Sequence, residues 1–157
     1  MTTTQWLLGF HLLGAFLFVS GAVAVGLLHA SAMRRERPSE VAFLLGLTRP
    51  AVALVGTGAL LTLAFGAWLV HEHGFAWGDA WISGALVLWL AAVVLGGIGG
   101  RSARHTRYLA ERLAAASDEP SEELRRTLVD PAARVLNYGS FLSVVAVLAL
   151  MVWKPGA

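Results

Sequence analysis

Residues 6–32 read WLLGFHLLGAFLFVSGAVAVGLLHASA, a run without Lys, Arg, Asp or Glu. A helix that crosses a bilayer needs about 20 such residues. Three further runs of this kind lie at about residues 51–70, 80–100 and 135–153. Because these runs are apolar on every side, they have no polar face for water, which argues against a soluble bundle. The sequence predicts an all-α, integral membrane four-helix bundle that forms one four-span domain over residues 1–157.

The composition agrees with a membrane protein and excludes several kinds of site. Hydrophobic residues make up 57% of the chain and charged residues 14%, whereas a soluble domain carries about 25% charged residues. The net charge is +2, but the arginines lie in short loops, and we expect no nucleic-acid partner. The absence of cysteine excludes disulfides and thiolate chemistry. The first apolar run lacks a basic start and is too long for a signal peptide, so we expect it to remain in the mature protein.

The basic residues predict how the spans are oriented. Eleven of the twelve Lys and Arg residues fall in the loops 31–50 and 101–134, whereas the loop 71–80 has none and the C-terminal tail has only Lys154. Cytoplasmic loops carry such an excess. We therefore expect a multi-pass protein of the inner (plasma) membrane with both termini outside. An aromatic belt at the outer surface would then be formed by Trp6, Trp77, Trp81 and Trp153.

The two cytoplasmic loops contain patterns of short amphipathic helices. Pro38 starts one, with an apolar stripe that includes Val41 and Leu45, and Pro120 precedes another that contains Leu124. The segment 102–116 is a third, with arginines around an apolar side. Such helices often lie in the membrane interface beside anionic lipid. For the segment 102–116, an extension of the third span into the cytoplasm is an equal alternative.

Five histidines are the main candidates for chemistry in or near the membrane. The predicted topology places His11, His71 and His73 toward the outside, and His29 and His105 at the inside. His11 and His29 share one face of the first helix, about 27 Å apart along its axis. Of the five, His11 alone lies well inside a span, where polar groups are costly and often mark a site.

The arrangement of the outer histidines suggests a cofactor. Gly14 and Gly21 lie near the side of His11 and would admit either a neighbouring helix or a flat cofactor. Histidines from two helices at one depth can ligate haem iron or begin a metal site. We therefore predict haem b between His11 and His71, or a metal ion held by His11, His71 and His73.

Simpler roles exist for each of these residues. His11 can form a hydrogen bond with a neighbouring helix, and His71 and His73 can be solvated in a polar loop. His29 and His105 border the headgroups and can be ordinary interfacial residues. The glycines from Gly96 to Gly100 indicate close packing or a flexible end of the third span.

Two stretches of the chain resemble a known family. The segment FHLLGA (residues 10–15), continuing to Gly21, resembles the opening of a bacterial family of predicted four-span integral membrane proteins of unknown function, domain-of-unknown-function family 2269. The ending ALMVWKPG (residues 149–156) resembles that family's close. The start of the third span at Trp81 and its glycine-rich, arginine-flanked end fit as well. The resemblance covers essentially the whole chain.

That family is similar to copper-resistance proteins of the CopD type and to oxygen-independent protoporphyrinogen oxidases of the HemJ type, which are associated with haem b. Both groups have a histidine followed by a small residue in the first span, matched here by His11 and Gly14. The resemblance thus implies haem or metal at His11. HemJ-type proteins also use a lysine in the third span, and residues 80–100 contain none, which counts against oxidase activity. With Met1, Met33 and Met151 as the only methionines, a rich copper site is not supported.

The sequence leaves two functions open. The first is a small haem- or metal-binding membrane protein built around His11, as part of a redox or transport assembly. The second is a cofactor-free membrane protein that acts through helix packing with a second copy or another membrane protein. Whether the protein is an enzyme stays undetermined at this stage, and the lipid bilayer is its expected environment.

Overall fold

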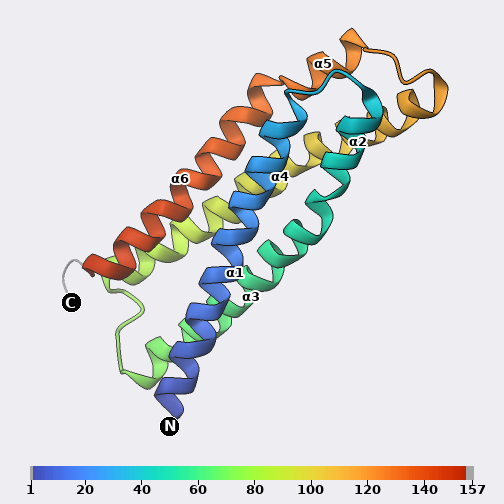
Figure 1. Cartoon of the computed structure of the whole chain (residues 1–157). Coiled ribbons are helices and arrows are strands. Elements are labelled where there is room, and N and C mark those ends of the chain that lie inside the picture. Colours follow the sequence, from blue (N-terminus) through green and yellow to red (C-terminus); the bar gives the residue numbers. More distant parts are fainter. Residues whose placement is uncertain (1, 155–157) are drawn as a thin grey trace.

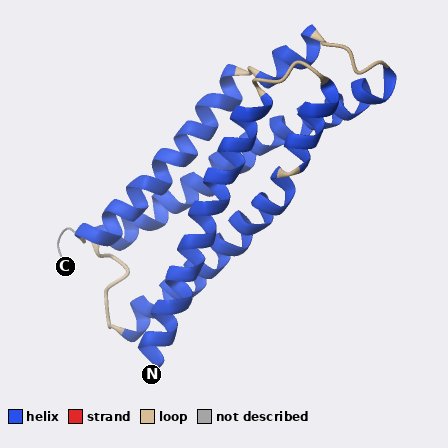
Figure 2. Ribbon diagram, in the orientation of Figure 1, coloured by secondary structure: helices blue, strands red, loops and turns tan. Residues whose placement is uncertain are grey.

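The structure, a computed structural model, describes residues 2–154, and within that range it consists of helices joined by loops, without strands (Figures 1 and 2). The predicted all-α fold is confirmed. The helices are α1 (Thr3–Ala32), α2 (Pro38–Gly46), α3 (Thr48–Glu72), α4 (Ala80–Ala116), α5 (Glu122–Leu128) and α6 (Pro131–Trp153).

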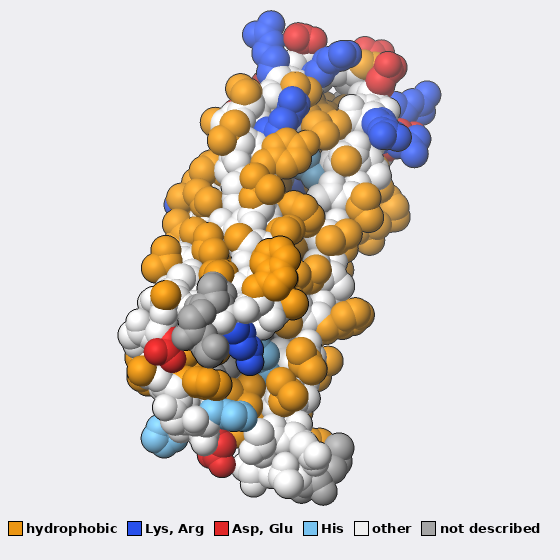
Figure 3. Space-filling model, turned by 90° about the vertical axis from the view of Figure 1, so that its left-hand side faces the viewer, with side chains coloured by type: hydrophobic (Ala, Val, Ile, Leu, Met, Phe, Trp, Pro, Cys, Tyr) orange, Lys and Arg blue, Asp and Glu red, His pale blue; other side chains and the backbone are white. Residues whose placement is uncertain are grey.

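Four helical stretches are long and apolar enough to cross a membrane, as predicted. They are α1, α2 with α3, α4, and α5 with α6. Only 11–22% of the residues in their apolar windows are buried inside the protein, so most of this apolar surface faces outward. Figure 3 shows hydrophobic side chains over the middle of the molecule and charged side chains toward its ends. A surface of this kind is stable only when lipid covers it.

Local sequence sets the ends of the helices. Thr2 caps α1 in a capping box with Gln5, whose backbone N–H lies 3.4 Å from the Thr2 hydroxyl oxygen. Pro50 has no N–H to donate to the Gly46 carbonyl, and the helix is interrupted between α2 and α3 at Leu47. After α3 the chain turns at Gly74, whose φ of +67° is a conformation that glycine adopts without strain.

The spans pack as two antiparallel pairs (Figure 1). We call α1 with α3 the first hairpin and α4 with α6 the second hairpin. One end of the bundle holds α2, α5 and the two arginine-containing loops, and we call it the Arg-rich end. The opposite end holds the start of α1, the loop between α3 and α4, and the end of α6.

Buried apolar residues form three layers along the bundle. The Arg-rich-end layer joins α1, α2, α4 and α5. The middle layer joins all four spans, and the opposite-end layer joins the end of α3 to the start of α4. The buried members of the Arg-rich-end layer are Ala32, Val41, Leu45, Leu109, Ala110, Leu124 and Leu128. Those of the middle layer are Phe18, Ala59, Ala92 and Val144. Those of the opposite-end layer are Val70, Trp81 and Ile82.

The sequence predicted that the amphipathic helices of the Arg-rich end lie in the membrane interface, and the structure differs from this prediction. The segment 102–116 continues α4 without a break, so the alternative of an extended third span is correct. The apolar stripes of α2 and α5 are buried inside the protein: Val41 is 0%, Leu45 1% and Leu124 2% exposed. These faces pack against one another and against α4, because helices that meet can bury their apolar sides together and do not need lipid for it.

Candidate functional site

The two helices of the first hairpin approach each other closely at three glycines. A Cβ atom on Gly14 would lie 2.6 Å from the backbone nitrogen of Thr62, and one on Gly21 would lie 2.8 Å from the Ala51 carbonyl oxygen. On α3, a Cβ atom on Gly58 would collide with the backbone nitrogen of Phe18. The sequence predicted that Gly14 and Gly21 admit either a neighbouring helix or a flat cofactor. In the structure, both glycines admit the neighbouring helix α3.

The close approach brings His11 onto the backbone of α3. Its Nδ1 atom lies 3.0 Å from the Thr62 carbonyl oxygen. A carbonyl oxygen only accepts, so Nδ1 carries the proton, and in the neutral ring Nε2 keeps a free lone pair. Gly66 makes room for the ring, because a Cβ atom there would lie 3.0 Å from His11 Cε1. The imidazole is thus fixed in position and in tautomer.

His11 lines a cleft between the two hairpins. The cleft offers about 70 Å³ of room to water-sized molecules, and it lies between the middle and the opposite-end layers. No Asp, Glu, Lys or Arg lines it. Its largest lining side chains, besides His11, are Trp77, Trp81, Trp89 and Met151.

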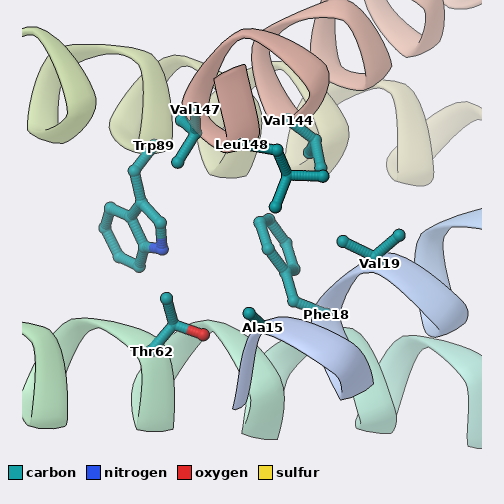
Figure 4. A pocket seen from close by; sticks show the side chains of 8 residues that line it. All are labelled: Ala15, Phe18, Val19, Thr62, Trp89, Val144, Val147 and Leu148. Carbon is teal, nitrogen blue, oxygen red and sulfur yellow. The ribbon is translucent and has the colours of Figure 1, made fainter. Parts of the chain in front are cut away.

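Three residues that line this cleft have a buried polar atom without a hydrogen-bond partner. The buried side-chain atoms that have none, within residues 2–154, are Thr62 Oγ1, Trp81 Nε1, Trp89 Nε1 and Arg107 Nε, and the first three belong to residues of the cleft. A smaller cavity of about 20 Å³, room for about one water molecule, adjoins the cleft and shares Thr62 and Trp89 with it. Figure 4 shows these two side chains reaching from opposite hairpins toward the same space.

His71 and His73 lie apart from His11. Both are exposed at the opposite end, and neither lines the cleft. The Nδ1 atom of His73 donates to the Leu69 carbonyl oxygen at 2.9 Å, and its ring stacks on Phe75. Among residues 2–154, no group of three His, Cys, Asp or Glu side chains is arranged to hold a metal ion. The predicted ligand set is therefore not assembled in this structure.

The two histidines toward the Arg-rich end, His29 and His105, have different surroundings. His29 is half-buried and lies beside the backbone of Leu128, where α5 ends. It therefore lies where α1 meets α5 at the Arg-rich end. His105 is exposed, as expected of an interfacial residue. The second hairpin closes nearby through Ser140, whose hydroxyl donates to the Ala92 carbonyl oxygen at 2.8 Å beside Gly96, so close packing explains that glycine.

The unpaired donors are the feature that sequence reasoning missed. Trp81 was assigned to the aromatic belt, yet it is 5% exposed and lines the cleft, whereas Trp6, Trp77 and Trp153 are at least half exposed. Trp89 lies in the middle of the third span, where an indole N–H has no headgroup or water to bond. The position of Trp89 in the sequence could therefore have indicated an N–H group without a partner.

Comparison with known protein families places the chain. The model of a family described as predicted integral membrane protein (DUF2269) matches residues 5–155. The chain belongs to this family. As a DUF2269 protein it is an integral membrane protein, and the lipid bilayer is its environment. No curated protein and no solved structure matches the chain. The similarity to CopD-type and HemJ-type proteins stays a prediction from the sequence.

Proposed function

We propose that this DUF2269 protein binds one small molecule in the cleft, with His11 as the group that holds it. The Arg-rich end faces the cytoplasm in this proposal, so the cleft lies in the outer half of the inner membrane. The excess of eleven basic residues to one supports this orientation.

The geometry of His11 carries the proposal. A histidine that donates through Nδ1 to a backbone carbonyl presents Nε2 as a ligand, in the manner of metal-binding histidines held by a second group. Its ring lines a cleft that two hairpins enclose. A half-buried imidazole that only had to form one hydrogen bond would not need this open space beside it.

Haem b is the first ligand to test. A bare metal ion needs several protein ligands, which the described residues do not bring together. Haem brings four ring nitrogens to its own iron, and His11 Nε2 would hold the iron from the protein. Bound haem would supply one-electron chemistry. If His71 or His73 also held the iron, that side chain would have to turn toward the cleft.

An absorbance titration tests this proposal. Wild-type protein in lipid nanodiscs, as purified and after addition of hemin, should give a saturable Soret band. His11→Ala should lose it, whereas His105→Ala, whose side chain is exposed at the Arg-rich end, should keep it. His71→Ala and His73→Ala identify a second ligand if either lowers the affinity. Metal analysis of the same samples tests whether the protein binds a metal ion instead of haem. A folded wild type without bound metal and without a hemin-dependent band would refute haem and metal binding.

One observation favours a second function. The Thr62 carbonyl already pairs with His11, and three glycines bring the first hairpin together. On this second proposal the protein has no cofactor and acts by packing with a second copy or another membrane protein. His11→Ala would then cost on the order of 1 kcal/mol of stability, as for other interhelical hydrogen bonds in membranes, and the wild type would contain no cofactor.

A further inference from the structure

The two hairpins are joined unequally at the two ends of the bundle. At the Arg-rich end, buried residues from α1, α2, α4 and α5 pack in one layer, and Asp118 accepts two hydrogen bonds from Ser39 of α2. At the opposite end, the buried layer consists of Val70 from α3 with Trp81 and Ile82 from α4. Among the described residues, no hydrogen bond or ion pair joins α1 or α3 to α4 or α6 at that end. The Arg-rich end is therefore the firmer joint.

A small cluster of rings and one lysine completes the contact at the opposite end. Phe75 is held by the first hairpin, because its N–H donates to the Val70 carbonyl oxygen at 3.1 Å and its ring stacks on that of His73. The ring of Trp81, in the second hairpin, stands at 87° to that of Phe75, with the centroids 5.4 Å apart. The Nζ atom of Lys154, just after α6, lies 5.9 Å from the Phe75 centroid and 5.5 Å from the Trp81 centroid. We call Phe75, Trp81 and Lys154 the latch.

The closed latch is a weak contact that has costs of its own. An ammonium group over an aromatic ring at an exposed site favours the contact only about two- to fivefold. Lys154 has a φ of +39°, in the left-handed region that a lysine adopts at a cost. Trp81 Nε1 is covered by protein and has no hydrogen-bond partner, which also costs free energy. Opening of this end would remove the last two costs.

The cleft beside the latch is small while the latch is closed. Its room of about 70 Å³ holds a few water molecules, whereas pockets for small ligands measure roughly 300–1,000 Å³. Trp81 belongs both to the latch and to the wall of the cleft. A molecule of ordinary ligand size therefore fits beside His11 only when the hairpins move apart at the opposite end.

We propose that the two hairpins separate and close again at the opposite end, and that the latch holds them closed. The middle layer and the Arg-rich-end layer stay packed in both states and act as the pivot. Opening widens the cleft and exposes Trp81 Nε1 to water or lipid headgroups. The motion needs no ligand, so this inference goes beyond the proposed function and does not rest on it.

Pairs of spin labels measure the separation of the hairpins. The chain has no cysteine, so Gly9→Cys with Val152→Cys labels α1 and α6 at the opposite end. Leu27→Cys with Val135→Cys labels the same two helices toward the Arg-rich end, and all four positions are exposed. Double electron–electron resonance in lipid nanodiscs should give two distance populations for the first pair and one for the second. Two populations for the second pair, or a single one for the first pair in wild type and in every latch variant, would overturn the proposal.

Matched variants test the latch. Lys154→Met keeps the length of the side chain and removes its charge, and it should raise the ratio of open to closed protein about two- to fivefold. Phe75→Leu should raise this ratio further, because it also removes the edge contact with Trp81. Lys154→Arg should keep the wild-type ratio, since a guanidinium group also binds over aromatic rings.

Trp77→Leu is the control for Phe75→Leu. Trp77 lies in the same loop, is 52% exposed and is not part of the latch, so its loss should leave the ratio of open to closed protein unchanged. If Lys154→Met and Phe75→Leu both keep the wild-type ratio, or if Trp77→Leu raises it as much as Phe75→Leu does, the latch is wrong and the proposal fails.

Addition of hemin to the labelled proteins separates this inference from the proposed function. We expect bound hemin to raise the open population of the first pair. If the opposite end opens without hemin and hemin gives no Soret band, the inference stands and haem binding fails. If hemin gives a His11-dependent Soret band while the first pair keeps one population with and without hemin, the inference fails and the proposed function stands.

Discussion

Thr62 shows how one residue joins the packing of the helices to the candidate site. Its carbonyl oxygen pairs with His11, its backbone nitrogen lies against Gly14, and its hydroxyl is one of the unpaired polar atoms of the cleft. The first two contacts require the backbones of α1 and α3 to be close. The geometry of His11 therefore depends on the small residues of the first hairpin, and not on His11 alone.

The glycines of α3 provide a test of this dependence. Gly58→Ala should destabilise the protein by roughly 1–3 kcal/mol, the usual cost of overpacking, because the added methyl group meets the backbone of α1, including the Gly14 carbonyl oxygen at 2.7 Å. Gly56→Ala, two residues away, has no atom within 4 Å of the added group and should be neutral. Unfolding in mixed detergent micelles measures both. Equal stabilities would show that the first hairpin is not tightly packed in solution.

Sequence could identify His11 and the small residues beside it, because burial in a span and the absence of a side chain are local properties. It could not identify the partner of His11. Any helix offers backbone carbonyls, and which of them reaches His11 depends on how α1 and α3 dock. The unpaired N–H groups of Trp81 and Trp89 were equally out of reach, because a missing hydrogen bond is visible only when all neighbours are known.

At the scale of elements, α2 begins with a cap from a distant loop. Asp118, between α4 and α5, accepts from the Ser39 backbone N–H at 2.7 Å and from the Ser39 hydroxyl at 2.8 Å. The bond from the Ser39 N–H, then that from its hydroxyl, and the charge of Arg37 hold the pKa of the Asp118 carboxyl below its ordinary value of 3.8. The carboxylate also lies at the positive end of the α2 dipole.

This cap predicts a dependence on pH. Since the folded state lowers the pKa of Asp118, its contribution is complete above pH 3.8 and is lost as the pH falls below 3.8 through the folded value. Hydrogen exchange of the α2 amides should be slower in wild type than in Asp118→Asn at pH 6, and the difference should disappear in strong acid. Asn tolerates the left-handed backbone of residue 118, which has φ +54°. Glu119→Gln, an exposed neighbour, is the control, and equal exchange in all three proteins at pH 6 would contradict the cap.

Sequence predicted which segments are helical more reliably than it predicted where they lie. Pro38 and Pro131 are the first residues of α2 and α6, where the N–H that proline lacks is not needed, and this is local chemistry. Whether an amphipathic helix meets lipid or protein depends on the neighbours, and α2 and α5 meet protein. For the same reason the sequence could not decide whether residues 102–116 form a separate interfacial helix or extend the third span, as they do in α4.

At the scale of the whole molecule, the orientation is open to a direct test. The chain has no cysteine, so single cysteines report their own positions. Gly78→Cys and Ser117→Cys lie at opposite ends of the bundle and are exposed; Gly78 is preferred to Gly74 because Gly74 has a positive φ. A membrane-impermeant maleimide should label residue 78 in intact cells, and residue 117 only after lysis. The reverse result would invert the proposed orientation. Labelling of both in intact cells would place them on the same side, which excludes the single span predicted between them and the predicted topology with it.

The pairing of the spans could not be predicted from their composition. Four uniformly apolar helices can associate in several ways, and lipid gives no preference among them, since its tails are as apolar as the side chains. The choice of α1 with α3 and α4 with α6 follows from shape, through the glycines of the first hairpin and the contact of Ser140 with the backbone of α4.

The middle layer has an electrical consequence. Phe18, Ala59, Ala92 and Val144 close the bundle between the cleft and the Arg-rich end, with apolar and aromatic side chains packed around them. An ion that entered this layer would exchange its hydration for a medium of low dielectric constant, at a cost far above thermal energy. The cleft is therefore a dead end for ions, and the closed bundle acts as an insulator, so a cell can hold many copies of the protein without losing the voltage across its membrane.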